Sequence, residues 1–474
     1  MTALWTSAEV AAATGGKASG EWDADGVCID SRAVSIGDLF VAVEGPKFDG
    51  HDFVVEALER GASSAIVTRI PTDGKQTVNE DRLVLVDDTM VALQALARAA
   101  RARIKGRVAA VTGSVGKTTT KEALTLTLSR QGLAHATTGN LNNHWGVPLS
   151  LSRMPQDTDY AVLELGMNHA GEIEPLSKMV RPNVAVITTV EAVHLEFFSS
   201  VTDIANAKAE IFTGLESGGI AIIPADNSHY DHLAQAAATA GAEQIVSFGT
   251  DNGAAYRLIA WSVSDVGTRI AADVNGKRLV YDIGMMGKHM ALNSLAVLAT
   301  VDALGGDVEQ AAGDLNDMTP PTGRGARSTI AIANGSFDLI DESYNASPAS
   351  IAALAGALNA TRKRGRVILA LGDMLELGDR SDALHADLAT PIATDGIDCV
   401  FTAGPAMRHL HGALPSDQST AHAASAAELV PLITNFVEPG DVVAVKGSFG
   451  SHMSVVVDAL KELGRHTQSA VNGG

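Results

Sequence analysis

The stretch Ala109-Ala110-Val111-Thr112-Gly113-Ser114-Val115-Gly116-Lys117-Thr118-Thr119-Thr120 decides the fold of this chain. An apolar strand leads into a turn with a glycine at each end, and a helical stretch over residues 121–130 follows. Glycines let backbone N–H groups close around phosphate oxygens, and the start of a helix adds partial positive charge. The lysine can reach the β- and γ-phosphates of a nucleotide, and the next threonine hydroxyl can bind Mg²⁺. We therefore expect residues 113–119 to bind nucleotide phosphates.

This loop departs from the strict phosphate-loop pattern at one position. Val111 stands where the pattern G-x-x-x-x-G-K-[ST] has its first glycine. A glycine-rich turn that binds nothing is the alternative interpretation. The order of strand, turn and helix favours phosphate binding.

The composition is that of a globular protein with several domains. The chain has 474 residues, which is too long for one ordinary core and predicts two to four domains. Hydrophobic residues make up 46% and charged residues 19%, so the chain is not disordered. Because the net charge is −20, we expect no nonspecific binding to nucleic acid or to acidic membranes.

The cysteines and the apolar runs bear on the compartment. Cys28 and Cys399 lie far apart, so we expect buried free thiols rather than a disulfide framework. Glu9 interrupts the N-terminal segment before a signal-like apolar core can form, and no apolar run reaches membrane-spanning length. The sequence thus predicts a cytoplasmic protein without stable membrane insertion, and we expect a monomer.

The hydrophobic pattern predicts an α/β protein with three domains, over residues 1–104, 105–318 and 319–474. The first is a small α/β unit with strands over 38–43 and 64–67. Composition marks the second boundary, because the segment from Met318 to Gly323 is rich in proline and glycine. The third is a doubly wound, Rossmann-like unit. Its strands are expected over residues 337–340, 367–371, 399–402 and 441–445.

Strands and helices alternate in the central domain. The expected strands cover residues 108–112, 160–165, 184–188, 219–224 and 244–248. Such alternation predicts a parallel sheet, with ligands bound beyond the carboxyl ends of its strands. Glu164 ends one strand and His194 follows another, so we expect both beside the nucleotide. A carboxylate there suits Mg²⁺, although a surface glutamate and a structural histidine are the alternatives.

Lys208 lies on an apolar stripe. In the helical segment 203–215 it follows Ile204 by four residues and precedes Ile211 by three. Burial of an ammonium lowers its pKa, and the neutral amine can add CO₂ to form a carbamate that binds metal. The pattern alone favours the alternative, a lysine at the edge of the stripe whose charged end reaches water.

The loop from Gly139 to Pro148 is dense in amides and glycines. Asn140, Asn142 and Asn143 each carry hydrogen-bond donors and acceptors, which suits a polar substrate. A loop that binds no ligand is an equally good interpretation of this composition.

Together these motifs resemble the Mur ligase family. The central motifs come in the order of that family: residues 113–122, 139–148, 164–168 with 171–173, 191–196 and 207–211. Further similar motifs are Asp341–Ala346, Leu371–Gly378 and Lys446–Ser448 in the third domain, and Asp30–Arg32 and Phe48–His51 in the first. The resemblance covers all three expected domains.

The resemblance implies an ATP-dependent amide ligase with a UDP-binding N-terminal domain, a central ATPase domain and a C-terminal ligase domain. ATP would phosphorylate the terminal carboxylate of a UDP-N-acetylmuramoyl-tripeptide. The amine of D-alanyl-D-alanine would then attack the acyl phosphate, a step of peptidoglycan precursor synthesis. The sequence leaves open whether the third residue of the tripeptide is meso-diaminopimelate or lysine.

The resemblance also implies roles for single residues. Lys117 and Thr118 would hold phosphates and a first Mg²⁺, while Glu164, His194 and a carbamylated Lys208 would surround a second Mg²⁺. Further nucleotide contacts are implied for Asn293 at adenine, Arg324 near the phosphates and Asp341 near the ribose. We expect the substrate contacts to come from Ser31, Asn140, Asn142, Asn143 and Asn345.

Two positions differ from the family, and two alternatives stay open. Met290 stands where a polar residue is usual, and Phe449 where arginine is common. One alternative is a MurE-like or folylpolyglutamate synthase-like amide ligase. The other is a non-catalytic nucleotide-gated binding protein. The Asn-Ala pair after Tyr344 and the run from Gly372 to Gly378 favour addition of D-alanyl-D-alanine.

Overall fold

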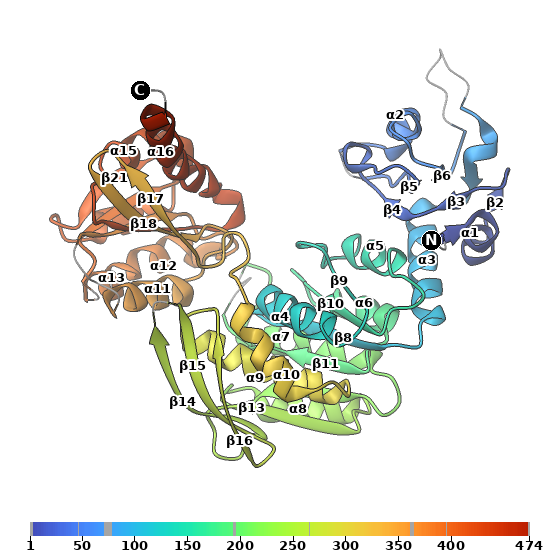
Figure 1. The fold of residues 1–474 in the computed structure, drawn as a ribbon, viewed down its shortest axis with the longest axis horizontal. Helices are drawn as coiled ribbons and strands as arrows, with labels where there is room; N and C mark the ends of the chain where they lie inside the picture. Colours follow the sequence, from blue (N-terminus) through green and yellow to red (C-terminus); the bar gives the residue numbers. More distant parts are fainter. Residues whose placement is uncertain are drawn as a thin grey trace. The chain divides into compact units, whose positions relative to one another are not determined.

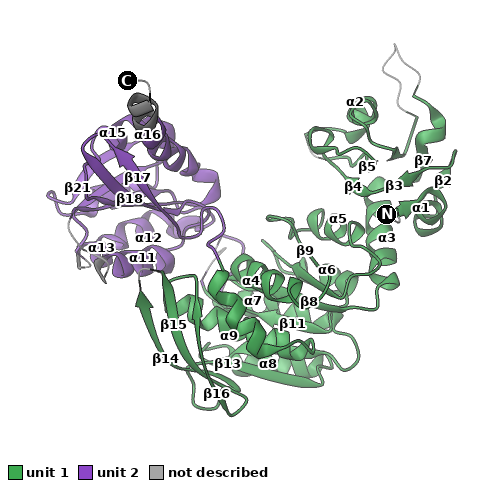
Figure 2. Cartoon of the chain, in the orientation of Figure 1, with its two compact units in different colours: residues 1–191, 201–318 green, residues 192–200, 319–474 purple. Residues whose placement is uncertain are grey.

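The computed structural model describes residues 3–45, 47–70, 78–192, 196–264, 266–360, 365–394 and 396–472. The chain divides into two compact units (Figure 2). The first comprises Met1–Glu191 and Val201–Met318, and the second comprises Ala192–Ser200 and Thr319–Gly474. The expected domains 1–104 and 105–318 thus belong to one unit.

The N-terminal part of the first unit is a small α/β layer. Its described strands follow the order β2 (Lys17–Ala18), β7 (Leu83–Leu85), β6 (Ser64–Val67), β5 (Asp38–Val41) and β4 (Gly26–Cys28). All pairs are parallel except β2 with β7. Helix α2 (Val54–Glu59) precedes β6, and α3 (Thr89–Arg103) leads into the central domain. The two expected strands are confirmed.

The central sheet contains the five expected strands. Its parallel part has the order β9 (Ala134–Ala136), β10 (Tyr160–Glu164), β8 (Arg107–Thr112), β11 (Val184–Ile187), β12 (Ile220–Pro224) and β13 (Gln244–Gly249). Strands β10 and β11 flank β8, the strand that enters the phosphate loop. The carboxyl ends of these three strands therefore meet at one edge. Strand β9 is too short to stand out in the sequence.

An antiparallel extension follows β13, which the expectation of a purely parallel sheet missed. Strand β14 (Tyr256–Ser264) pairs with β13 in parallel, whereas β15 (Gly267–Val274) is antiparallel to β14 and β16 (Lys277–Ile283) is antiparallel to β15. Strand β14 carries three exposed hydrophobic side chains, Ile259, Trp261 and Val263. Its hydrophobic residues are therefore not confined to a buried face. The usual pattern of a half-buried strand is therefore weak in this segment.

Helices α4 (Lys117–Ser129) and α9 (Lys288–Ala303) lie side by side against one face of this sheet (Figure 1). Their aliphatic side chains share one core with β8, β10 and β11. Helix α4 begins at Lys117, four residues before the expected start. The prediction began too late because the first turn of the helix is polar. Among the described residues, no helix combines the length and apolar character needed to cross a membrane.

The second unit is doubly wound, as expected. Its described strands follow the order β17 (Ala326–Ile332), β18 (Gly335–Glu342), β22 (Val442–Lys446), β19 (Val367–Gly372), β20 (Cys399–Ala403) and β21 (Ser419–Ala423). Only β17, an edge strand that the sequence did not reveal, is antiparallel to its neighbour. Separate hydrophobic clusters cover the sheet, one with α11 (Pro348–Ala360) and one with α15 (Ala426–Thr434).

Residues 192–200 belong to the second unit although their neighbours in sequence belong to the first. The backbone N–H of Glu196 donates to the carbonyl of Glu376 at 3.2 Å. A Cβ atom added to Gly378 would lie 3.3 Å from Cα of Glu196. Glu196 is thus packed directly on the loop that follows β19.

Candidate functional site

The phosphate loop connects β8 with α4 and needs both of its glycines. Gly113 and Gly116 have φ angles of +151° and +86°. A Cβ atom on Gly113 would lie only 1.9 Å from Oγ1 of Thr188, so no larger residue fits without a shift. Lys117 Nζ donates to the Gly113 carbonyl at 2.7 Å. The lysine therefore bends back over the loop that it follows.

The residues that follow β11 hold this loop in place through hydrogen bonds. Thr188 Oγ1 donates to the carbonyl of Val115 at 2.6 Å, and Ser114 N–H donates to the carbonyl of Thr189 at 2.9 Å. The hydroxyl of Ser114 accepts from Glu191 N–H at 2.8 Å and donates to the carbonyl of that residue at 3.1 Å. The side chain of Ser114 thus holds the loop in place. No motif in the sequence pointed to Thr188 as a residue of this site.

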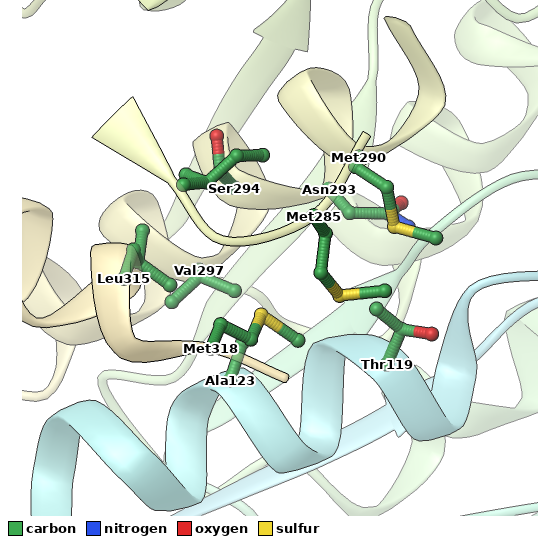
Figure 3. Close-up of a pocket in the computed structure, with 10 residues that line it drawn as sticks. Thr119, Ala123, Met285, Met290, Asn293, Ser294, Val297, Leu315 and Met318 are labelled. Atoms are coloured by element: carbon green, nitrogen blue, oxygen red, sulfur yellow. The ribbon is translucent and has the colours of Figure 1, made fainter. Parts of the chain in front are cut away.

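A small apolar hollow lies between α4 and α9 (Figure 3). Thr119 and Ala123 line it from α4, and Asn293 lies at the Gly116 side, 3.0 Å from where a Cβ of that glycine would be. Ser294 also lines it, but its hydroxyl bonds to Tyr281 and to the Ala291 carbonyl. The remaining wall is Ile283, Met285, Met290, Val297, Leu315 and Met318.

Glu164 is buried at the carboxyl end of β10, with only 1% of its surface exposed. Its Oε1 accepts a hydrogen bond from Asn142 Nδ2 at 2.7 Å. Its Oε2 is buried and has no hydrogen-bond partner among the described residues. A buried carboxylate oxygen without a partner is costly, which makes Glu164 fit for a cation ligand.

Lys208 lies on α7 (Val201–Ala209) with 2% of its surface exposed. The interpretation favoured by the pattern, a lysine with its charged end in water, is therefore wrong. Burial, and then the positive charge of Lys117, lower the pKa of Lys208 well below its usual value.

His194 lies outside the described residues. Within the described ranges, no group of three or more His, Cys, Asp and Glu side chains could hold a metal ion by itself. Glu164 would therefore share a metal ion with donors of another kind, such as a threonine hydroxyl, a carbamate or a phosphate, or with a residue outside the described ranges, such as His194.

The asparagine loop contains one residue turned toward the site. Asn142 contacts Glu164, whereas Asn140 is exposed. Asn143 is also exposed, and its Oδ1 accepts from the N–H groups of Trp145 and Gly146 at 3.1 and 3.0 Å. Asn143 therefore stabilises the start of α5 (Gly146–Ser152).

In the N-terminal layer, Ser31 is buried and its hydroxyl is 3.3 Å from Oε2 of Glu56. His51 is also buried, between the carboxylate of Asp49 at 2.6 Å and the N–H of Thr68 at 2.9 Å. Since Nε2 of His51 accepts from Thr68, its Nδ1 carries the proton and donates to Asp49. This histidine holds its loop to β6.

The remaining predicted residues, Arg324, Asp341 and Asn345, lie in the second unit. Oδ1 of buried Asp341 accepts from the N–H and the hydroxyl of Ser343 at 3.2 and 2.6 Å. Asn345 is exposed at the end of this loop. The guanidinium of Arg324 lies 4.1 Å from the ring centre of Tyr344.

Comparison with known proteins agrees with this architecture. The sequence matches the Mur ligase family, catalytic domain over residues 23–101, the Mur ligase middle domain over 111–301, and the Mur ligase, glutamate ligase domain over 327–449. The chain therefore belongs to the Mur ligase family.

Individual relatives are similar over nearly their full length. A UDP-N-acetylmuramoyl-tripeptide–D-alanyl-D-alanine ligase from Rickettsia prowazekii is 35% identical, over 96% of this chain and 99% of the relative. The crystal structure of MurF from Acinetobacter baumannii is 32% identical with a TM-score of 0.84, over 97% of this chain and 99% of that one. MurF ligase from Thermotoga maritima in complex with ADP is 29% identical with a TM-score of 0.77, over 93% and 98%.

Proposed function

We propose that this chain is an ATP-dependent, ADP-forming ligase that joins D-alanyl-D-alanine to a UDP-N-acetylmuramoyl-tripeptide in peptidoglycan precursor synthesis. The similarity to the Rickettsia prowazekii ligase over 96% of the chain carries this proposal. The phosphate loop and the buried Glu164 support it, because they supply the donor set that phosphoryl transfer needs.

The reaction has two steps. The tripeptide carboxylate takes the γ-phosphoryl group of ATP and becomes an acyl phosphate, with ADP as the leaving group. The amine of D-alanyl-D-alanine then attacks the carbonyl carbon, inorganic phosphate leaves, and the amine loses a proton. The Lys117 ammonium and the backbone N–H groups of the loop stabilise charge on the phosphates.

Mg²⁺ fits the donors of this site, and would neutralise phosphate charge when bound. We assign the Thr118 hydroxyl to a first ion and Glu164, His194 and carbamylated Lys208 to a second. The Oε2 atom of Glu164, which lacks a protein partner, is the observation that supports this assignment. The buried position of Lys208 favours the neutral amine that adds CO₂.

The other predicted residues are assigned the roles that the resemblance to the Mur ligases implies. Asn293 borders both the loop and the hollow, which suits a residue beside the nucleotide base. Arg324 and Asp341 are assigned to the phosphates and the ribose. Ser31, Asn140, Asn143 and Asn345 remain predicted substrate contacts, whereas Asn142 acts on Glu164.

Phosphate release by the purified chain tests the function. The reaction contains ATP, Mg²⁺ and a UDP-N-acetylmuramoyl-tripeptide that ends in meso-diaminopimelate or in lysine. Release should depend on added D-alanyl-D-alanine and should not occur with diaminopimelate or glutamate as the acceptor. Activity with a diamino acid on a shorter UDP-linked peptide would favour the MurE-like alternative. Nucleotide binding without acceptor-dependent release would favour a binding protein.

We further propose that the protein is cytoplasmic and monomeric. The substrates are nucleotides and nucleotide-linked sugars, and Cys28 is a buried free thiol, which suits a reducing compartment. Sedimentation at the mass of a single 49.0 kDa chain would support the monomer.

A further inference from the structure

Three side chains of the second unit, Arg324, Tyr344 and Phe449, lie in a row. The Arg324 guanidinium lies over the ring of Tyr344, 4.1 Å from its centre. The rings of Tyr344 and Phe449 are tilted, with their centres 5.7 Å apart. Phe449 is 67% exposed.

The backbone around Arg324 is fixed to the same unit. Its N–H donates to the Pro321 carbonyl at 3.0 Å, which closes a turn. On one side of Arg324, the Gly323 carbonyl accepts from Tyr344 N–H at 3.1 Å. On the other, Gly325 N–H donates to the carbonyl of Asp341 at 2.8 Å. Both glycines have positive φ angles, +74° and +96°.

These contacts leave the charged end of Arg324 available. Among the described residues, the guanidinium has a ring beneath it and no hydrogen-bond acceptor. Stacking on an aromatic face restricts the side chain but leaves the N–H groups in the plane of the guanidinium free for an anion. An arginine that is ordered before its ligand arrives loses less conformational entropy on binding.

We propose that Tyr344 is a positioning residue, which holds Arg324 ready for the nucleotide phosphates, and that Phe449 supports Tyr344 from its exposed side. This inference rests on the proposed function, because that function assigns the phosphates to Arg324. The aromatic ring of Tyr344 does this work, and its hydroxyl is not needed.

A double-mutant cycle in the full-length protein tests the proposal, with kcat/KM for ATP as the readout. Tyr344→Leu should lower this value by roughly threefold to tenfold, the range of a cation–π contact. Tyr344→Phe, the matched control, should keep the wild-type value. In the Arg324→Ala background, Tyr344→Leu should have no further effect. Phe449→Ala should show a smaller loss, which also disappears in that background.

Several outcomes would overturn the proposal. If Tyr344→Leu has the same effect with and without Arg324, the ring acts on its own. If Tyr344→Phe loses as much as Tyr344→Leu, the hydroxyl is the important group. Thermal melting separates both from a general folding defect, which would lower the melting temperature of Tyr344→Leu in either background. A wild-type chain with no ligase activity would refute the proposed function instead, and the cycle would then be read from ATP affinity.

Discussion

Asn142 donates a 2.7 Å hydrogen bond from its side-chain amide to Oε1 of Glu164, and Oε2 of the same carboxylate has no partner among the described residues. One oxygen is thus held by the protein and the other is left for a cation. Asn142 therefore orients the carboxylate through one oxygen, and the proposed metal ion would bind the other.

Loss of the amide should weaken metal use. Asn142→Ala is expected to raise the Mg²⁺ concentration required for half-maximal phosphate release by about tenfold, because an outer partner of a metal ligand is removed. Asn252→Ala is the matched control, because it removes an exposed side-chain amide that accepts from Arg257 and has no predicted role in the site. Equal Mg²⁺ titrations for the two variants would show that Asn142 does not position Glu164.

Nucleotide binding should require Gly116 for two reasons, its positive φ angle and the space that its missing side chain leaves beside Asn293. Gly116→Ala places a Cβ 3.0 Å from the Asn293 amide, whereas Gly241→Ala meets nothing within 4 Å at a similar φ angle, +90° against +86°. Both variants should lose about 1 kcal/mol of unfolding free energy. Only Gly116→Ala should also weaken ADP binding, by about tenfold. Calorimetric titration with ADP measures this difference, and equal affinities would contradict it.

Lys117→Ala should lower kcat by about 100-fold or more, because a charged donor to the phosphates is lost. The fold should be retained, since the hydrogen bond that Lys117 Nζ donates to the Gly113 carbonyl lies within one loop. Lys178→Ala removes an exposed lysine paired with Glu174 and serves as the control. Near-normal phosphate release by Lys117→Ala would refute the assignment of the loop.

Lys208 should act as a carbamate. Lys208→Ala is expected to be nearly inactive, and a short carboxylic acid added to the assay should restore part of the rate by supplying the missing oxygen anion. Lys208→Arg should stay inactive, because a guanidinium remains cationic. An active Lys208→Arg enzyme, or a failure of every small acid tested, would leave a role for the amine itself.

The lowered pKa of Lys208 also predicts a pH dependence of stability. Between that pKa and the usual value of 10.5, the unfolded chain binds more protons than the folded one, so stability rises with pH. In bicarbonate-free buffer, Lys208→Met should melt a few degrees above the wild type at neutral pH. The advantage should shrink as the pH approaches 10. A constant difference in melting temperature would mean that Lys208 does not titrate in this way.

The sequence predicted the parallel strands well, because their apolar runs are short, continuous and followed by glycine or polar residues. It did not predict β14–β16, where Ile259 and Trp261 are exposed. The apolar stripe through Ile204, Lys208 and Ile211 was predicted correctly, since all three side chains are buried. The pattern alone favoured a Lys208 whose charged end reaches water, because a local pattern does not show how deeply a helix face is covered.

Contacts between distant residues were the other limit. The phosphate loop is evident from its own residues, but Thr188 is 73 positions away from Val115, whose carbonyl it binds. Asn142 and Glu164 are 22 positions apart, and composition alone suggested only that the asparagine binds something polar. Such pairs arise from the order of strands in the sheet, which a local pattern does not contain.

The position of segment 192–200 affects how gene fragments of this protein can recombine. The chain passes between the two units after Glu191, after Ser200 and after Met318. A gene fragment that starts at Thr319 therefore lacks one piece of the second unit, the piece that packs on Glu376 and Gly378. Recombination at that boundary would join a new C-terminal unit to the old segment. The two stretches are therefore expected to evolve together, and hybrids of distant relatives should function better when both are exchanged.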